Sequence, residues 1–224
     1  MALVIFDLDN TLIAGDSDHA WGEFLVERKI VDADYYKAKN DQFYQDYQSG
    51  ELKIEDYLAF ALEPLANNNL DDLLAWREVF LEEKILPIML PKAKTLISKH
   101  RKQGDYLLII TATNQFVTER IAELLEVDDI IATTPEQNDQ GFTGKVAGTP
   151  SFKEGKITRL NTWLAQQDHS MEGSYFYSDS HNDLPLLELV DFPIAVDPDD
   201  ILKAHCEKHD WPIWTLRNLE KDSK

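Results

Sequence analysis

The sequence predicts an α/β fold: a doubly wound, Rossmann-like parallel sheet with an inserted helical cap domain. Three observations support this fold class. Short apolar runs of strand length recur along the chain, amphipathic stretches of helical period separate most of them, and one long segment near the N-terminus has helical period only. Because parallel sheets of this type bind ligands at the carboxyl ends of their strands, functional residues are expected there.

The expected strands are brief, unbroken apolar runs bounded by turn-forming or polar residues. They span residues 3–6, 106–110, 130–132, 175–177 and 193–196, with a possible edge strand at 213–216. The amphipathic stretches between them predict helices at residues 92–102, 115–125, 156–165 and 184–190. Glycines around residues 140–146 favour a tight hairpin that leaves the sheet.

Residues 16–88 are expected to form the cap domain, and residues 1–15 and 89–224 the core domain. Two stretches of the cap, GELKIEDYLAFALEPL and NLDDLLAWREVFLEEKIL, space their apolar residues so that each helix buries one face. Pro64 and the residues Asn67 to Asn69 separate the two stretches as a turn. A chain of 224 residues has room for one α/β domain and this smaller lobe.

The composition restricts the classes of partner. With 41 acidic and 22 basic residues, the formal net charge is −19, which disfavours nucleic acid and serves either solubility or the attraction of cations. The start MALVIFDLDNTL has no basic residue, so it predicts neither a signal peptide nor a membrane anchor, and no later stretch predicts a membrane span. The single cysteine, Cys206, excludes an internal disulfide. The expected compartment is the cytoplasm, without a membrane partner, and the sequence leaves monomer and dimer open.

The strongest chemical signal is VIFDLDNTL, an apolar strand that ends in Asp7 and Asp9. Since side chains alternate along a strand, the two carboxylates would point the same way unless the chain turns there. Two like charges so close require a divalent cation or a shared proton. The alternative is an Asp-rich turn that caps a helix through Asn10 and Thr11.

Other strand ends carry complementary groups. Thr111 follows the run YLLII, and Asp179 follows YFYS, with Asp183 four residues later. Lys156 precedes a helix between them, and Lys153 competes with it as the functional lysine. A carboxylate nucleophile, a hydroxyl donor, a fixed cation and a metal-binding acid are what phosphoryl transfer through a covalent intermediate requires.

Together, FDLDNT, Thr111, Lys156 and SDSHND resemble the four motifs of the haloacid dehalogenase superfamily, in the phosphoserine phosphatase-like branch (subfamily IB). The resemblance implies that Asp7 attacks phosphorus to form an aspartyl-phosphate, and that Asp9 acts as general acid and base. It further implies a magnesium-dependent phosphatase of small phosphorylated metabolites.

The same resemblance implies the metal site and the phosphate site. Mg²⁺ would be held by Asp7, Asp179 and the backbone carbonyl of Asp9, and Asp183 would support this metal site through hydrogen bonds. The groups that would contact the phosphoryl oxygens are the hydroxyl of Thr111, the amide of Ala112 and the side chains of Lys156 and Asn182.

The cap would select the substrate. Phosphoserine phosphatases that resemble this chain use a cap glutamate for the ammonium, where this chain has Asp16, and a cap arginine for the carboxylate, where alignment gives Ala59. The segments AGDSD and SFKEGK are similar to a subgroup that includes histidinol-phosphate phosphatases, whose substrate has cationic groups and no carboxylate. Histidinol phosphate is therefore the expected substrate; phosphoserine, another small metabolite, a phosphomutase reaction and a non-catalytic phosphate- or metal-sensing module are the alternatives.

Several cap residues have two interpretations. Asp16 and Asp18 could instead cap a helix, with Asp18 the stronger candidate. His19 and His181 are expected to pack rather than to bind metal. Most aromatic residues of the cap are expected in the core, while one or two could stack on a substrate ring; they are Trp21, Phe24, Tyr35, Tyr36, Phe43, Tyr44 and Tyr47.

Overall fold

The computed structural model describes residues 1–217. Within these residues, six parallel strands form one sheet in the order β3-β2-β1-β6-β7-β8. Their bounds are β1 (Leu3–Phe6), β2 (Tyr106–Asn114), β3 (Asp129–Thr133), β6 (Tyr175–Ser178), β7 (Phe192–Val196) and β8 (Ile213–Trp214). The predicted α/β fold with a doubly wound parallel sheet is confirmed, and the expected edge strand is present as the short β8.

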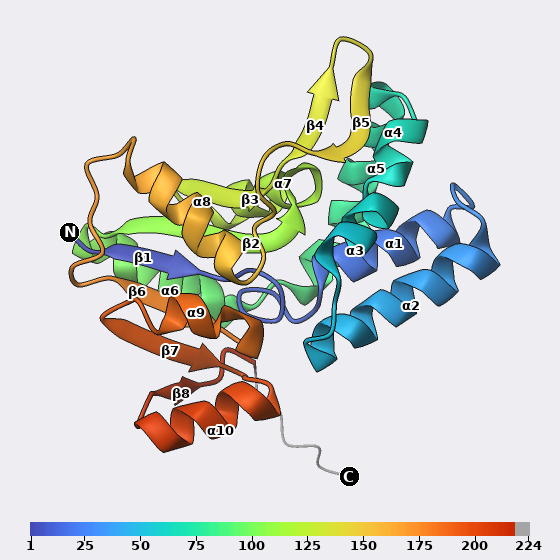
Figure 1. The fold of residues 1–224 in the computed structure, drawn as a ribbon. Helices are drawn as coiled ribbons and strands as arrows, with labels where there is room; N and C mark the ends of the chain where they lie inside the picture. The colour runs from blue at the N-terminus through green and yellow to red at the C-terminus, as the bar shows by residue number, and fades with distance from the viewer. Residues whose placement is uncertain (218–224) are drawn as a thin grey trace.

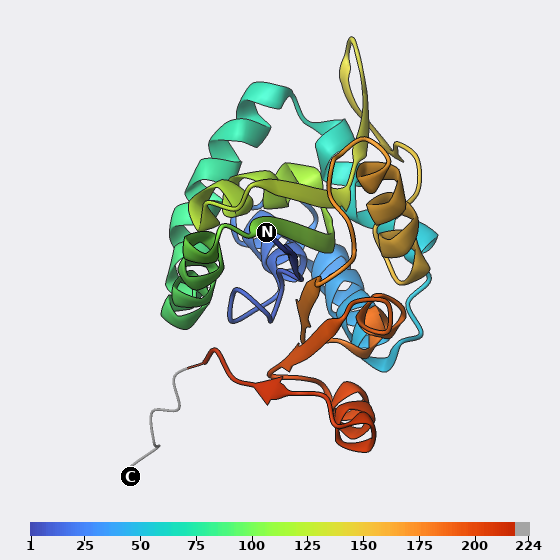
Figure 2. The ribbon, with the colours of Figure 1, turned by 90° about the vertical axis from the view of Figure 1, so that its left-hand side faces the viewer.

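Helices cover both faces of the sheet (Figures 1 and 2). On one face, Val4 and Phe6 of β1 share a core with α6 (Pro91–Gln103) and α7 (Gln115–Leu125). On the other face, Leu3 and Ile5 share a core with α8 (Glu154–Leu164), α9 (Leu184–Leu187) and α10 (Asp200–His209). A strand buried on both faces must be apolar throughout, which explains the unbroken run before Asp7.

The chain from Ser17 to Ile88 is helical, as predicted. It contains α1 (Ser17–Glu27), α2 (Ala33–Ser49), α3 (Ile54–Ala61), α4 (Glu63–Asn67) and α5 (Leu70–Phe80), followed by a π-helical turn (Leu81–Ile85) and a 3₁₀ turn (Leu86–Ile88). Figure 1 shows that the β1 arrow points toward this group of helices. Ile13 and Met89 form an antiparallel bridge where the chain leaves and returns to the sheet. We propose that this crossing bounds the cap at residues 16–88.

The predicted hairpin is present as β4 (Pro135–Asn138) and β5 (Gly141–Val146), an antiparallel pair outside the main sheet. It extends away from the sheet beside α4 and α5 (Figure 1), and β5 contacts α4 and α3. Gly144 has a φ of +77°, and a Cβ there would lie 3.2 Å from the Cβ of Ala66, so this close approach requires glycine. The sequence did not predict this contact between hairpin and cap.

Two element boundaries differ from the prediction. Strand β2 continues to Asn114 because a register shift against β3 between Ile110 and Asn114 lets polar residues extend the strand past its apolar run. Helix α9 is only four residues long, after a 3₁₀ turn at His181–Asp183, and ends well before residue 190. In residues 1–217, no helix combines the length and apolar character that crossing a bilayer requires.

Candidate active site

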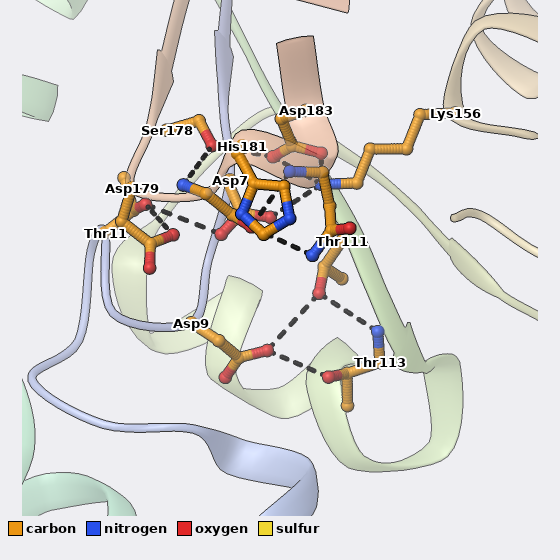
Figure 3. A network of polar contacts seen from close by, with 12 residues as sticks. Asp7, Asp9, Thr11, Thr111, Thr113, Lys156, Ser178, Asp179, His181 and Asp183 are labelled. Carbon is orange, nitrogen blue, oxygen red and sulfur yellow. Dashed lines mark hydrogen bonds and ion pairs between the residues drawn. The ribbon is translucent and has the colours of Figure 1, made fainter. Parts of the chain in front are cut away.

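The chain turns directly after β1, and this turn separates the directions of Asp7 and Asp9. The amide of Asp7 still donates to the carbonyl of Tyr177 at 2.8 Å, as a strand residue would. The carbonyl of Leu8 then accepts from the amide of Leu12 at 2.9 Å, and Asn10 adopts a φ of +56°. The Asp7 side chain therefore contacts Lys156, whereas the Asp9 side chain contacts Thr113 (Figure 3).

Lys156 is the lysine that reaches the end of β1. Its Nζ donates at 2.8 Å both to Oδ1 of Asp7 and to Oδ2 of Asp183, and the residue is 2 % exposed. Asp183 also accepts from the Ser178 hydroxyl at 2.7 Å, so a further hydrogen bond holds the Asp183 end of this bridge. Lys153 instead donates to the backbone carbonyl of Gly50 at 3.0 Å. The helix start thus directs one lysine to the strand ends and the other to α2.

The strand ends hold more negative than positive charge. Burial raises the pKa of Asp7 to about 7, although Lys156 lowers it, and Asp183 and Asp9 raise it further. Burial, together with the charges of Asp7 and Asp183, raises the pKa of Asp179 well above its usual range. Burial alone would lower the pKa of Lys156, but Asp183 and Asp7 raise it above the usual lysine range. Three carboxylates therefore lie near one another, and the one ammonium group there contacts only Asp7 and Asp183, so a further cation would relieve their repulsion.

The donor set fits a magnesium ion. The Thr11 hydroxyl lies 3.4 Å from Oδ2 of Asp7 and 3.2 Å from Oδ1 of Asp179, so the two carboxylates flank the same small space (Figure 3). Within residues 1–217, no three His, Cys, Asp or Glu side chains form a ready metal cluster. The two carboxylates of Asp7 and Asp179 are enough for Mg²⁺, since this ion is held by few protein oxygens and keeps its remaining positions for water and phosphate.

Asp9 is held by three donors on the cap side of the turn. Its Oδ1 accepts from the amide of Ser17 at 2.6 Å, and its Oδ2 accepts from the hydroxyls of Thr113 at 2.8 Å and Thr111 at 3.4 Å. Burial raises the pKa of Asp9 to about 7, and the charge of Asp16 adds to the effect while the hydrogen bonds oppose it. Thr113 was not predicted, although its spacing of two from Thr111 is the strand period.

The irregular end of β2 positions the predicted phosphate donors. Thr111 and Ala112 lie in the register shift, and both line a cavity beside Asp7 and Asp9. The Ala112 carbonyl accepts from the Thr133 hydroxyl at 2.8 Å, which holds the peptide in place. Asn182 is not among the residues that line this cavity, and its Nδ2 donates at 3.2 Å to the carbonyl of Tyr47 and to Ser180.

The cavity lies between these strand ends and helices α1 to α3. Acidic, aromatic and small polar side chains line most of it, and no lysine or arginine is among the lining residues of the described chain. The lining comprises Asp7, Asp9, Asp16, Asp18, His19, Asn40, Phe43, Tyr44, Tyr47, Leu52, Ile54, Tyr57, Thr111, Ala112, Thr113 and Phe152. Such a surface suits a ligand with a phosphate at one end and positive or aromatic groups at the other.

The helix-capping expectation is wrong for Asp18. Asp16 is the N-cap of α1, and its Oδ1 accepts from the amides of Asp18 at 3.0 Å and His19 at 2.8 Å. Asp16 also lines the cavity. A contact between Asp16 and the substrate must therefore leave its helix-capping hydrogen bonds in place. The Asp18 carboxylate caps no helix and instead accepts a hydrogen bond from Asn114.

Ala59, expected where the resemblance has a cap arginine, lies outside the cavity. Ala59 is exposed and does not line the cavity, so the residue there says nothing about an arginine in the site. From α3 the cavity instead receives Ile54 and Tyr57. Neither side chain is cationic, so α3 gives the cavity no positive charge for a substrate carboxylate. The expectation that phosphoserine lacks a cationic partner therefore rests on Ile54 and Tyr57 and not on Ala59.

The aromatic residues of the cap divide into two groups. Trp21, Phe24 and Tyr36 are buried in the core, as expected, whereas Tyr35 is exposed on the surface, contrary to expectation. The aromatic cap residues that line the cavity are Phe43, Tyr44, Tyr47 and Tyr57, of which Tyr57 was not predicted.

His19 and His181 both have carboxylate partners. Nε2 of His19 lies 3.2 Å from Asp41, and its ring packs against Tyr44. Nδ1 of His181 lies 2.8 Å from Asp199. A Cβ on Gly50 would come within 2.7 Å of the His181 ring, so this ring packs against the end of α2, as expected from the sequence.

Comparison with known proteins gives a family and two kinds of relative. The model of the haloacid dehalogenase-like hydrolase family matches residues 4–188. A histidinol-phosphatase of Neisseria meningitidis is 45% identical over 96% of this chain and 99% of its own length. A phosphoserine phosphatase of Mycobacterium tuberculosis is 27% identical over the full chain and 73% of its own length.

Solved structures agree with this relationship. A protein of unknown function from Bordetella pertussis superposes with a TM-score of 0.91 at 40% identity, covering 96% of this chain and 99% of that one. A substrate-bound phosphoserine phosphatase superposes with a TM-score of 0.70, covering 96% and 93%. Its identity is 17%, so that likeness concerns the fold alone.

Proposed function

The chain belongs to the haloacid dehalogenase-like hydrolase family, and from this membership we propose that it is a phosphatase that acts on a small phosphorylated metabolite through an aspartyl-phosphate at Asp7. The observation that carries the proposal is the buried contact of 2.8 Å between Asp7 and Lys156 at the carboxyl end of β1. A carboxylate that is oriented by a lysine and lies beside a second acid, Asp9, has what a nucleophile for phosphorus needs.

The proposed reaction has two displacements. In the first, a carboxylate oxygen of Asp7 bonds to phosphorus, the bond from phosphorus to the alcohol oxygen breaks, and Asp9 gives that oxygen its proton. In the second, a water molecule attacks phosphorus, Asp9 takes its proton, and the Asp7 carboxylate and inorganic phosphate are released. The hydrogen bonds from Thr113 and Ser17 keep Asp9 on the leaving-group side throughout.

The remaining residues stabilise charge and orientation. Lys156 would neutralise the phosphoryl group, and Thr111 and the Ala112 amide would donate to its oxygens. Asp7, Asp179 and the Asp9 carbonyl would hold Mg²⁺, which when bound supplies positive charge to the phosphoryl oxygens.

Histidinol phosphate is the substrate we propose within this class. Two observations support it: the name of the 45% identical relative, and a cavity whose described lining has three acids beyond Asp7 and no lysine or arginine. Phosphoserine is the second candidate, because the relative at 27% identity carries that name. Its carboxylate would be buried without a cationic partner in this cavity, which typically costs several kcal/mol.

The test is a measurement of inorganic phosphate released from histidinol phosphate and from phosphoserine, with magnesium present. We expect a higher kcat/KM for histidinol phosphate and no release by the Asp7→Asn variant. Equal or better turnover of phosphoserine would refute the substrate, and full activity of Asp7→Asn would refute the covalent mechanism.

A further inference from the structure

Asp18 is a buried acid with neutral partners. It is 7 % exposed, and its Oδ1 accepts from Nδ2 of Asn114 at 3.3 Å. Tyr57, a polar neighbour without charge, also lowers the pKa of this carboxylate. The orientation of Asn114 is fixed, because its Oδ1 accepts from the amide of Val117 at 3.2 Å. The amide nitrogen of Asn114 must therefore face Asp18, and it is a donor without charge.

No structural role accounts for this carboxylate. Asp16 supplies the N-cap of α1, so Asp18 is not needed to start the helix, although its place in the first turn gains slightly from the helix dipole. Across residues 1–217, no lysine or arginine forms an ion pair with Asp18. Burial raises its pKa to about 7, which means that the ionised form is costly in the folded chain. A group that costs stability and supports no element is typical of a binding site.

Aromatic rings surround the same part of the cavity. Phe43 and Tyr57 meet edge to face with centroids 5.4 Å apart, and both line the cavity with Tyr44. The faces of aromatic rings attract cations, and the attraction is strongest where water is excluded. Together with the Asp18 carboxylate, these rings form a surface for a positively charged organic group.

The position of Asp18 relative to Asp9 assigns this surface to the leaving group. Successive residues at the end of β2 hold the two acids, since Thr113 donates to Asp9 and Asn114 donates to Asp18. Asp9 is the proposed proton donor to the departing alcohol. A cation bound at Asp18 would therefore belong to that alcohol and not to the phosphoryl group.

We propose that Asp18, oriented by Asn114 and sharing the cavity with Tyr57, binds a protonated nitrogen of the alcohol, an ammonium or an imidazolium, and so determines specificity for phosphomonoesters of cationic alcohols. This inference rests on the proposed phosphatase function. It assigns the cation to Asp18 in place of Asp16, whose Oδ1 is already occupied by two amides.

The test compares three substrates with the Asp18→Asn variant: histidinol phosphate, phosphoethanolamine as a cation without the ring, and glycerol phosphate as a neutral alcohol. We expect kcat/KM for the two cationic substrates to fall about 10²-fold or more, as when a buried charge pair is broken, and glycerol phosphate to change less than about threefold. Asp34→Asn is the matched control, because it removes the same charge from an exposed cap residue that does not line the cavity. Its selectivity should equal that of the wild type.

Each outcome decides one question. Equal losses on all three substrates, or no loss, would overturn the role of Asp18 while leaving the phosphatase function intact. If the wild type preferred phosphoethanolamine and not histidinol phosphate, histidinol phosphate would be refuted as the substrate. The role of Asp18 would still stand if Asp18→Asn lost the preference for phosphoethanolamine. Should Asp18→Asn fold poorly, Tyr57→Phe must lower the preference for cationic substrates in the same direction, and an unchanged preference would overturn the inference.

Discussion

Replacing Asp18 by Asn should stabilise the protein, and the gain should grow with pH. Asn keeps the shape and one acceptor oxygen, so the bond from Asn114 can remain while the charge is lost. A site residue that evolved to bind a cation is expected to destabilise the ligand-free fold in this way.

The magnitude follows from the pKa of Asp18, which burial raises from 3.8 to about 7. Because the folded chain holds this proton more tightly than the unfolded chain, stability is highest below pH 3.8 and is lost as the pH rises to about 7. Each pH unit in this window costs about 1.4 kcal/mol, so the penalty is of order 2 kcal/mol at pH 5 and of order 4 kcal/mol at pH 8. The titratable neighbours that contribute to this environment are Asp9, Asp16, His19, Tyr36 and Tyr57.

The assay is urea denaturation of the metal-free wild type and Asp18→Asn at pH 5 and pH 8. We expect the advantage of the variant to be larger at pH 8 by about 2 to 3 kcal/mol. Asp34→Asn, at an exposed carboxylate, should show no such pH-dependent gain. A variant that is less stable than the wild type at pH 8, or a difference that is the same at both pH values, would refute the reasoning.

Four further predictions concern the catalytic groups. Asp9→Asn should lower kcat by about 10² to 10⁴ in phosphate-release assays, since it removes the general acid; a loss below tenfold would contradict that role. Lys156→Met should destabilise the fold by about 3 kcal/mol or more in denaturant titrations, because Asp7 and Asp183 lose their buried partner, while Lys153→Met serves as the control and should cost about 1 kcal/mol or less. Chelation of divalent ions should abolish phosphate release, and restored magnesium should recover it; activity that survives exhaustive chelation would argue against the metal. Magnesium should also raise the melting temperature, because a hundredfold excess over Kd adds about 2.7 kcal/mol of stability, and Asp179→Asn should remove this shift.

The sequence predicted the fold because its signals are local and repeated. Apolar runs buried on both faces of a sheet, as in β1 and β6, must be short and unbroken, and the helices between them must be amphipathic. The same reasoning placed the polar residues at the strand ends, because Asp7, Thr111 and Asp179 follow such runs. The boundaries of β2 and α9 were wrong, since a strand that continues through a register shift no longer needs apolar side chains.

What the sequence by itself determined is therefore the family, the sheet and the row of acids at its carboxyl edge. Only the tertiary structure decided between neighbouring candidates: Lys156 over Lys153, Asp18 over Asp16 as the acid left without a helix-capping role, and Tyr57 over Ala59 as the cavity-facing residue of α3. The physical reason is that residues two or three positions apart at the start of a helix can be of the same type and have the same helix propensity, so the sequence does not distinguish them. Which of them reaches a cavity depends on how the helix docks against distant segments and on which amides its first turn leaves to be capped.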